Sequence, residues 1–172
     1  FHEVAHGLGV KQTVNGRGTV DEAMGSEKTT WEEAKADILG LFMVRELIKM
    51  GEITDITAEE SIATFIAGIV RSVRFGSASS HGKANMMCFN YMVENGAFSR
   101  NDEGKYVVDF EKAPAVIDSW AELIIRTQAT GDLEFAQQYS AKNADITPEL
   151  ENDIKKVNEA GIPRDIVFDW AW

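Results

Sequence analysis

The sequence predicts a mainly α-helical fold of about seven helices with one small β-hairpin, and three observations support this expectation. Apolar residues recur with helical spacing in long runs, such as AKADILGLFMVRELIKM at 34–50. Residue pairs that start helices, such as Thr57 with Glu60, precede these runs, and glycines follow them. One stretch, FSRNDEGKYVVDF at 98–110, combines a polar turn with a β-branched and aromatic strand, which is typical of a hairpin.

Each further element has its own local signal. A first helix is expected at 2–8, and glycines mark 9–30 as a long irregular loop with room for a short hairpin. A loop of that length in a compact domain usually serves function. Thr30 with Glu33 fits a capping box for a helix that runs to Gly51. The remaining helices are expected at 57–76, 80–96, 114–131, 132–144 and 147–161, followed by an extended apolar tail at 162–172 that packs back on them.

The composition is that of a globular domain with an excess of acidic residues. The chain has 172 residues, enough for one domain with a sizeable core, and 44% of them are hydrophobic. Its net charge of −11 argues against nucleic acid or an anionic membrane as a partner. It has no run of eighteen apolar residues that would cross a membrane. The single cysteine, Cys88, lies in an apolar run and is expected in the core.

The chain begins with Phe1 rather than methionine and has no signal-peptide pattern. We therefore expect residues 1–172 to form a single helical domain that is a piece of a larger protein. The residues themselves give no indication of localisation.

The first residues, FHEVAHGLG, carry the clearest chemical pattern. His2 and His6 are four residues apart, so a helix places both imidazoles on one face, where they can bind one zinc ion. Glu3 lies close to that face and can reach a water molecule on the metal as a general base, as in the H-E-x-x-H pattern of zinc peptidases. The alternative is a surface helix that carries these three residues by chance.

A zinc ion held by two histidines needs at least one more protein ligand. The stretch EEAKAD offers Glu33 and Asp37, which are four residues apart and share a helix face. One carboxylate can bind the metal, and the other can accept the free N–H of a ligand histidine and fix its tautomer. Taken alone, the same residues also fit a solvated acidic face.

The third histidine, His81, lies near the start of a strongly apolar helix. It is either a helix-start residue without a further role or a donor that stabilises the transition state at the metal.

Four motifs in this order resemble the dipeptidyl peptidase III family of zinc metallopeptidases. HEVAHG is similar to the family's first zinc motif and EEAKAD to its second. SHGKANMMCFNYMVENG resembles the helix with the family's substrate-stabilising histidine, and IIRTQATGDLEFAQQY resembles the helical pair that follows. The resemblance covers roughly residues 1–145.

The resemblance implies a role for each matching residue. It makes His2, His6 and Glu33 the ligands of one Zn²⁺ and Glu3 the general base. It assigns to Glu32 and Asp37 hydrogen bonds to the ligand histidines, and to His81 the stabilisation of the transition state. The Glu32 role follows from the resemblance alone.

The chain departs from the family pattern in several places. Its first motif, HEVAH, has five residues where well-known members have six, and Asp37 stands where many members have glutamate. Family members have two lobes with the active site between them. The chain resembles the zinc-bearing helical lobe, so the missing N-terminal lobe of the same protein is an expected partner, along with short peptide substrates. The resemblance also favours a cytoplasmic location.

These observations predict a zinc-dependent peptide hydrolase that releases dipeptides from the N-termini of short peptides. The isolated chain is expected to fold but to have little activity, because it lacks the second lobe. Two alternatives stay open: a zinc hydrolase acting on a non-peptide substrate, and a non-catalytic helical module with a vestigial metal site. Retention of Glu3 argues against the latter, since a structural site needs no base.

Overall fold

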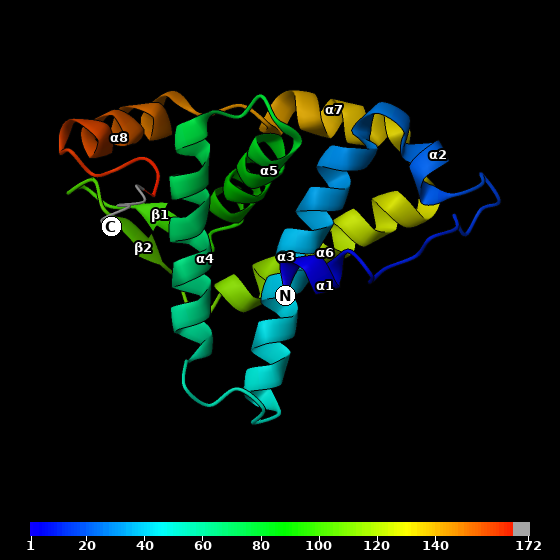
Figure 1. The fold of residues 1–172 in the computed structure, drawn as a ribbon, viewed down its shortest axis with the longest axis horizontal. Coiled ribbons are helices and arrows are strands. Elements are labelled where there is room, and N and C mark those ends of the chain that lie inside the picture. The colour runs from blue at the N-terminus through cyan, green and yellow to red at the C-terminus, as the bar shows by residue number, and fades with distance from the viewer. Residues whose placement is uncertain (167–172) are drawn as a thin grey trace, which may run out of the picture.

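A computed structural model describes residues 1–166 as a mainly helical structure with one two-stranded antiparallel sheet, which confirms the predicted fold class (Figure 1). The elements are α1 (His2–Ala5), α2 (Val20–Met24), the 3-10 turn η1 (Gly25–Glu27), α3 (Lys28–Lys49), α4 (Ala58–Ser72), the 3-10 turn η2 (Val73–Phe75), α5 (Ser80–Glu94), β1 (Phe98–Arg100), β2 (Tyr106–Val108), α6 (Ala113–Thr130), α7 (Leu133–Asn143) and α8 (Pro148–Glu159). None of the helices in this part of the chain is both long and apolar enough to cross a membrane.

Helix α3 is the centre of the fold. It contacts α1, α4, α5 and α6, and Figure 1 shows α1 lying across it near the middle of the molecule. Its residues Trp31, Ala36 and Ile38 are fully buried, and Trp31 packs beside Trp120 of α6 with ring centroids 6.3 Å apart. Burial of side chains of this size supplies most of the stabilisation of such a core. The site residues that α3 carries are therefore held on a rigid element.

The other helices form where their local signals predict. Thr57 and Glu60 make a complete capping box at the start of α4, and Gly131 ends α6 in the left-handed conformation. The hairpin pairs Phe98 with Val108, and Cys88 is buried in α5, both as expected. These elements agree with the sequence because caps, turns and strand alternation depend on neighbouring residues.

The region at 9–30 is the main correction to the predicted elements. Only its first half is a loop, closed by an isolated bridge between Gln12 and Thr19, and α2 and η1 follow directly. The capping box predicted at Thr30 and Glu33 is wrong. The box lies at Thr19 and Glu22, at the start of α2, whereas Thr30 is buried within the first turn of α3. Both sites have the S/T-x-x-E pattern, but α3 continues directly from η1 and begins at Lys28, so Thr30 is already helical and cannot be an N-cap.

Two predicted end segments also differ in extent. The first helix was expected at 2–8, but α1 ends at Ala5 with His6 as its C-cap. Of the tail at 162–172, residues 167–172 lie outside the described part. Residues 162–166 are exposed and contact the helices chiefly through Arg74, which donates to the carbonyl oxygens of Ile162 and Pro163.

Candidate metal centre

Helix α1 lies close enough to α3 to bring its histidines over the carboxylates of that helix. Gly40 is buried in α3, and a Cβ atom there would lie 3.2 Å from the backbone nitrogen of His2. Ala5 faces the core and is fully buried. The small residues at these two positions allow the two backbones to approach, so a helix of four residues is held in place by packing.

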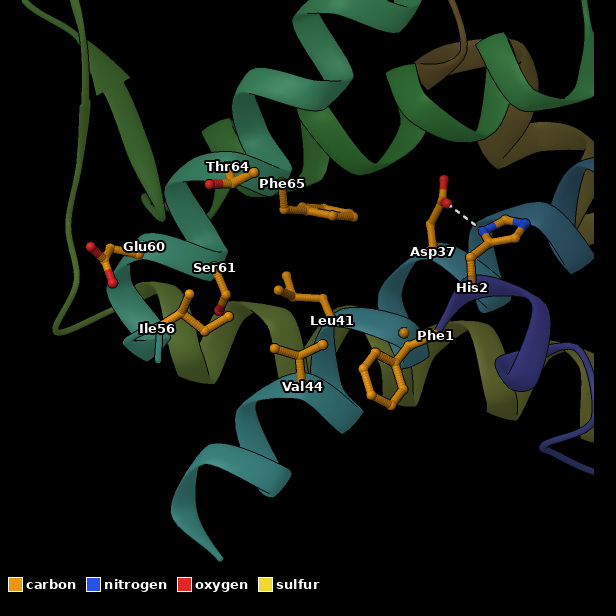
Figure 2. A pocket seen from close by; sticks show the side chains of 11 residues that line it. Phe1, His2, Asp37, Leu41, Val44, Ile56, Glu60, Ser61, Thr64 and Phe65 are labelled. Atoms are coloured by element: carbon orange, nitrogen blue, oxygen red, sulfur yellow. Dashed lines mark hydrogen bonds and ion pairs between the residues drawn. The ribbon is translucent and has the colours of Figure 1, made fainter. Parts of the chain in front are cut away.

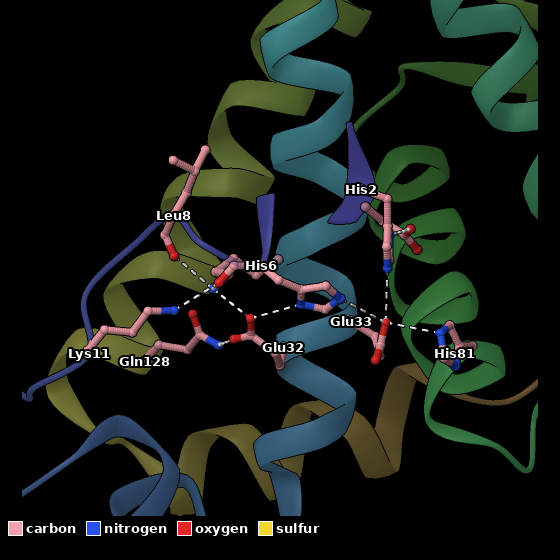
Figure 3. Close-up of polar contacts among 10 residues, drawn as sticks. His2, His6, Leu8, Lys11, Glu32, Glu33, His81 and Gln128 are labelled. Atoms are coloured by element: carbon pink, nitrogen blue, oxygen red, sulfur yellow. Dashed lines mark hydrogen bonds and ion pairs between the residues drawn. The ribbon is translucent and has the colours of Figure 1, made fainter. Parts of the chain in front are cut away.

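One carboxylate oxygen is the focus of the cluster. Glu33 Oε2 lies 3.3 Å from His2 Nε2, 3.8 Å from His6 Nε2 and 3.1 Å from His81 Nε2 (Figure 3). The Glu33 side chain is only 13% exposed, and among the described residues none forms a hydrogen bond of good geometry with Oε2. A buried acceptor without a donor is costly unless another group compensates it.

The opposite ring nitrogens of two histidines are held by carboxylates. His2 Nδ1 lies 2.7 Å from Asp37 Oδ1, and His6 Nδ1 lies 3.0 Å from Glu32 Oε1. A carboxylate can only accept, so each Nδ1 carries the proton and donates it. In the neutral rings the Nε2 lone pairs then face Glu33, and three electron-rich atoms meet with no hydrogen between them. A cation between these atoms would stabilise such an arrangement.

His81 reaches the cluster from the start of α5, through a tight turn. Ser79 caps this helix by accepting a hydrogen bond from the backbone N–H of Gly82. A Cβ atom at Gly82 would lie 2.5 Å from the carbonyl oxygen of Gly76, so only glycine lets the preceding loop fold against the helix. The His81 side chain is 65% exposed, and its Nε2 faces Glu33 (Figure 3).

The two supporting carboxyl groups have opposite pKa shifts. Burial raises the pKa of Asp37, and its hydrogen bond from His2 offsets this only in part. Burial also acts to raise the pKa of Glu32, but hydrogen bonds from Lys35, His6 and Gln128 outweigh it and hold the pKa below its usual range. The charged form of Glu32 is thus stabilised more strongly by its neighbours than the charged form of Asp37.

The structure brings most of the predicted site residues together. His2, His6, Glu33 and His81 converge, and Glu32 and Asp37 contact the two histidines for which the sequence proposed them; their roles stay predictions. Glu3 is exposed, and within the described part of the chain its carboxylate forms no hydrogen bond. The ligand atoms of His2, Glu33 and His81 all lie within 4.8 Å of one another, so His81 is closer to the metal position than the sequence suggested.

Sequence reasoning missed two polar residues that complete the surroundings of Glu32. Lys35 Nζ lies 2.7 Å from Glu32 Oε1, and Gln128 Nε2 of α6 donates to Glu32 Oε2 at 3.3 Å. The spacing of Lys35 three residues after Glu32 was a signal that the two could pair. Gln128 comes from another helix, and nothing local in the sequence pointed to it.

An apolar groove borders the cluster on the side of Asp37. It lies between α3 and α4, encloses about 460 Å³, and its walls include Phe1, Leu41, Val44 and Phe65 (Figure 2). Its end nearest the cluster is formed by the hydrogen-bonded pair of His2 and Asp37.

The donor set fits a zinc ion. Two imidazoles, from His2 and His6, and the Glu33 carboxylate are ligands that Zn²⁺ prefers, and their nitrogen and oxygen atoms at 3.3 and 3.8 Å are compatible with tetrahedral coordination. Such an ion would compensate the unpaired Glu33 Oε2 and the Nε2 atoms that face it. Hydrogen-bonded Nδ1 atoms are typical of zinc-binding histidines.

Comparisons with known proteins identify two similar solved structures. No protein-family model matches the chain. The solved structure of DPP III from Caldithrix abyssi superposes with a TM-score of 0.89 and 32% identity over 96% of this chain and 32% of that one. Dipeptidyl-peptidase III from Corallococcus sp. strain EGB superposes with a TM-score of 0.89 and 31% identity, over 96% of this chain and 31% of that one.

A curated relative carries a different name. Nudix hydrolase 3 from Arabidopsis thaliana is 33% identical over 168 residues, which are 96% of this chain but 22% of that protein. The chain therefore spans about a fifth of this relative and about a third of each solved structure. All three are hydrolases by name, and over nearly its whole length the chain is similar in structure to part of two dipeptidyl peptidase III enzymes.

Proposed function

We propose that the chain is the zinc-binding part of a metallopeptidase of the dipeptidyl peptidase III type. His2, His6 and Glu33 would hold one Zn²⁺. The observation that carries this proposal is the buried Glu33 Oε2, which forms no hydrogen bond with any described residue and is faced by imidazole nitrogens at 3.1–3.8 Å. Three such groups are stable together when a cation lies between them.

The similar structures supply the substrate class. Both are described as dipeptidyl peptidase III, and the similarity to each covers 96% of this chain. Release of dipeptides from short peptides follows as a proposal for the protein that contains this lobe. The groove beside His2 offers an apolar surface to a peptide side chain.

The residues of the chain divide the chemistry among them. A bound zinc ion supplies a Lewis acid and a water molecule whose pKa is lowered to about 7. Glu3 follows His2 directly on α1, and its exposed carboxylate is free to accept a proton from the attacking water and pass it to the leaving amine. His81 lies at the open side of the cluster, where it can donate to the developing oxyanion.

A second candidate is a zinc hydrolase acting on a non-peptide substrate. The name of the Arabidopsis thaliana relative favours it, although that protein extends far beyond the matched residues. The same metal cluster would serve either substrate, because a zinc ion and a base do not by themselves select the bond to be cleaved. Specificity would then depend on residues outside this chain.

Three variants test the metal and the base separately. Glu33→Ala should lower zinc content sharply, because it removes a ligand. Glu3→Gln should keep zinc content near that of the wild type while lowering kcat by about 10²–10⁴-fold, the usual contribution of a positioned base. His81→Ala should spare the metal and lower kcat more than it changes KM. Glu46→Ala, a change at an exposed ion pair on the same helix, is the control.

The assays are zinc content by atomic absorption on the chain and hydrolysis of dipeptidyl arylamides by the protein together with its second lobe. Loss of zinc in Glu3→Gln would make Glu3 a ligand and refute the assignment. Full activity in Glu3→Gln with zinc retained would refute the role of Glu3 as the general base, whereas no hydrolysis by the zinc-loaded wild type would favour the non-catalytic module. Hydrolysis of only non-peptide substrates would favour the second candidate.

A further inference from the structure

The most deeply buried charge near the cluster belongs to a residue with no role so far. Lys35 of α3 has a side chain that is only 2% exposed. Its ammonium donates to the carbonyl oxygen of Leu8 at 2.8 Å and to that of His6 at 3.4 Å, and it lies 2.7 Å from Glu32 Oε1. All three N–H donors are therefore used, which is what a buried ammonium requires.

These three contacts are made with His6, with Leu8 two residues later, and with the carboxylate that contacts the His6 ring. Glu32 Oε1 accepts from both Lys35 and His6 Nδ1, at 2.7 and 3.0 Å. The same ammonium donates to the backbone carbonyls of His6 and Leu8, just after α1 ends. Lys35 thus contacts the backbone of His6 directly and its ring through Glu32.

We propose that Lys35 is a positioning residue that holds His6 in the orientation and tautomer in which its Nε2 faces Glu33. This inference rests on the proposed function, in which His6 is a zinc ligand. At the His6 carbonyl itself, Lys11, an exposed residue, is the other side chain that donates in the described part. The ammonium also holds Glu32 Oε1 at 2.7 Å, in the position from which this oxygen contacts the His6 ring at 3.0 Å.

The neighbouring histidine provides an internal comparison. His2 Nδ1 is held by Asp37, which does not contact Lys35. If Lys35 merely stabilised the fold, its loss would disturb both rings alike. If it positions His6, only the His6 ring should change.

Lys35→Met tests the proposal, because methionine fills a similar space without charge or donors. Arg45→Met is the matched control: Arg45 is a second buried cation on α3, 3% exposed, paired with Asp118 at 2.8 Å and remote from the cluster. Zinc affinity of the full chain is measured by competition with a chromophoric chelator. Histidine side-chain ¹H–¹⁵N correlation spectra of the metal-free chain report the tautomer of each ring.

We expect Lys35→Met to weaken zinc binding by about 10–100-fold, the usual effect of losing support for a ligand histidine. Arg45→Met should change it less than about twofold. In the metal-free spectra, the Nδ1–H tautomer of His6 should be lost in Lys35→Met while His2 is unchanged. Equal zinc affinity in the two variants, or a His6 ring that keeps its tautomer, would overturn the inference.

Lys35→Gln keeps the test decisive if Lys35→Met does not fold. The amide retains N–H donors for a carbonyl oxygen but has no charge, so it should weaken zinc binding by a smaller factor and still shift the His6 tautomer. Failure of the proposed function has a different outcome. The wild type and Glu33→Ala would then bind zinc equally, whereas the His6 tautomer in the metal-free chain would still report on Lys35.

Discussion

Replacement of Gly40 by alanine should separate the stability of the fold from the integrity of the metal centre. In a helix interior, alanine is favoured over glycine by about 0.8–1.0 kcal/mol. Gly40 is a helical residue of α3, so this term alone would stabilise the chain. However, the new Cβ would lie 3.2 Å from the backbone nitrogen of His2 and 3.5 Å from its Cα.

The two effects act on different parts of the molecule. A contact of 3.2 Å is tight, so one backbone has to move by a few tenths of an ångström. Helix α3 is long and packed on four helices, whereas α1 has four residues, so α1 should move. The displacement of α1 costs free energy and offsets much of the stabilisation that alanine gains over glycine in a helix. We expect the free energy of unfolding to stay within about 0.5 kcal/mol of the wild type.

The metal centre should be affected more, because His2 lies at the point of contact. Ligands must be held within about 0.5 Å of their productive geometry. Zinc binding should therefore weaken by about tenfold, in the lower part of the range found for disturbed ligand support.

Gly68 is the matched control. It lies in α4, and a Cβ there would have no atom within 4 Å. Gly68→Ala should raise the free energy of unfolding by about 0.5–1 kcal/mol and leave zinc affinity unchanged. Stability is measured by urea unfolding in EDTA with tryptophan fluorescence, and zinc affinity by chelator competition. If Gly40→Ala matches Gly68→Ala in both measurements, close packing at Gly40 does not position His2.

Two further predictions concern carboxylates. Asp37→Ala should weaken zinc binding by about 10–100-fold, because His2 Nδ1 loses its acceptor, and chelator competition checks it. For Asp153, burial acts to raise the pKa, but hydrogen bonds from Arg100, Lys156 and Tyr106 outweigh it and hold the pKa at about 2. An aspartate whose pKa is lower in the folded state than in the unfolded chain stabilises the fold at pH values above the unfolded pKa of about 3.9. Asp153→Asn should thus lower the free energy of unfolding by about 1–2 kcal/mol at neutral pH. Urea unfolding should show that the difference from the wild type becomes smaller as the pH falls from about 4 to 2. A difference that is constant over this range would contradict the assignment.

Several features of the protein follow from neighbouring residues and were predictable from the sequence. Helices α4, α5, α7 and α8 begin at side-chain caps, such as Thr57, and α6 ends at Gly131, because each of these caps is a contact within a few residues. The i, i+4 spacing of His2 and His6, and of Glu33 and Asp37, indicated which side chains share a helix face. These regularities were sufficient to propose a helical fold and a metal-binding residue set.

The tertiary structure decided what local pattern left open. Thr19 and Thr30 both precede a glutamate at the capping-box spacing, but only Thr19 starts a helix, because α3 continues directly from η1 and already includes Thr30. His81 comes to lie 3.1 Å from Glu33 although nearly fifty residues separate them, because α5 packs on α3. Lys35 lies within the same short motif as Glu33, yet its burial under the loop after α1 was not visible in the sequence. Helical periodicity specifies which side chains share a face, whereas the distance between faces depends on how backbones pack, as they do at Gly40.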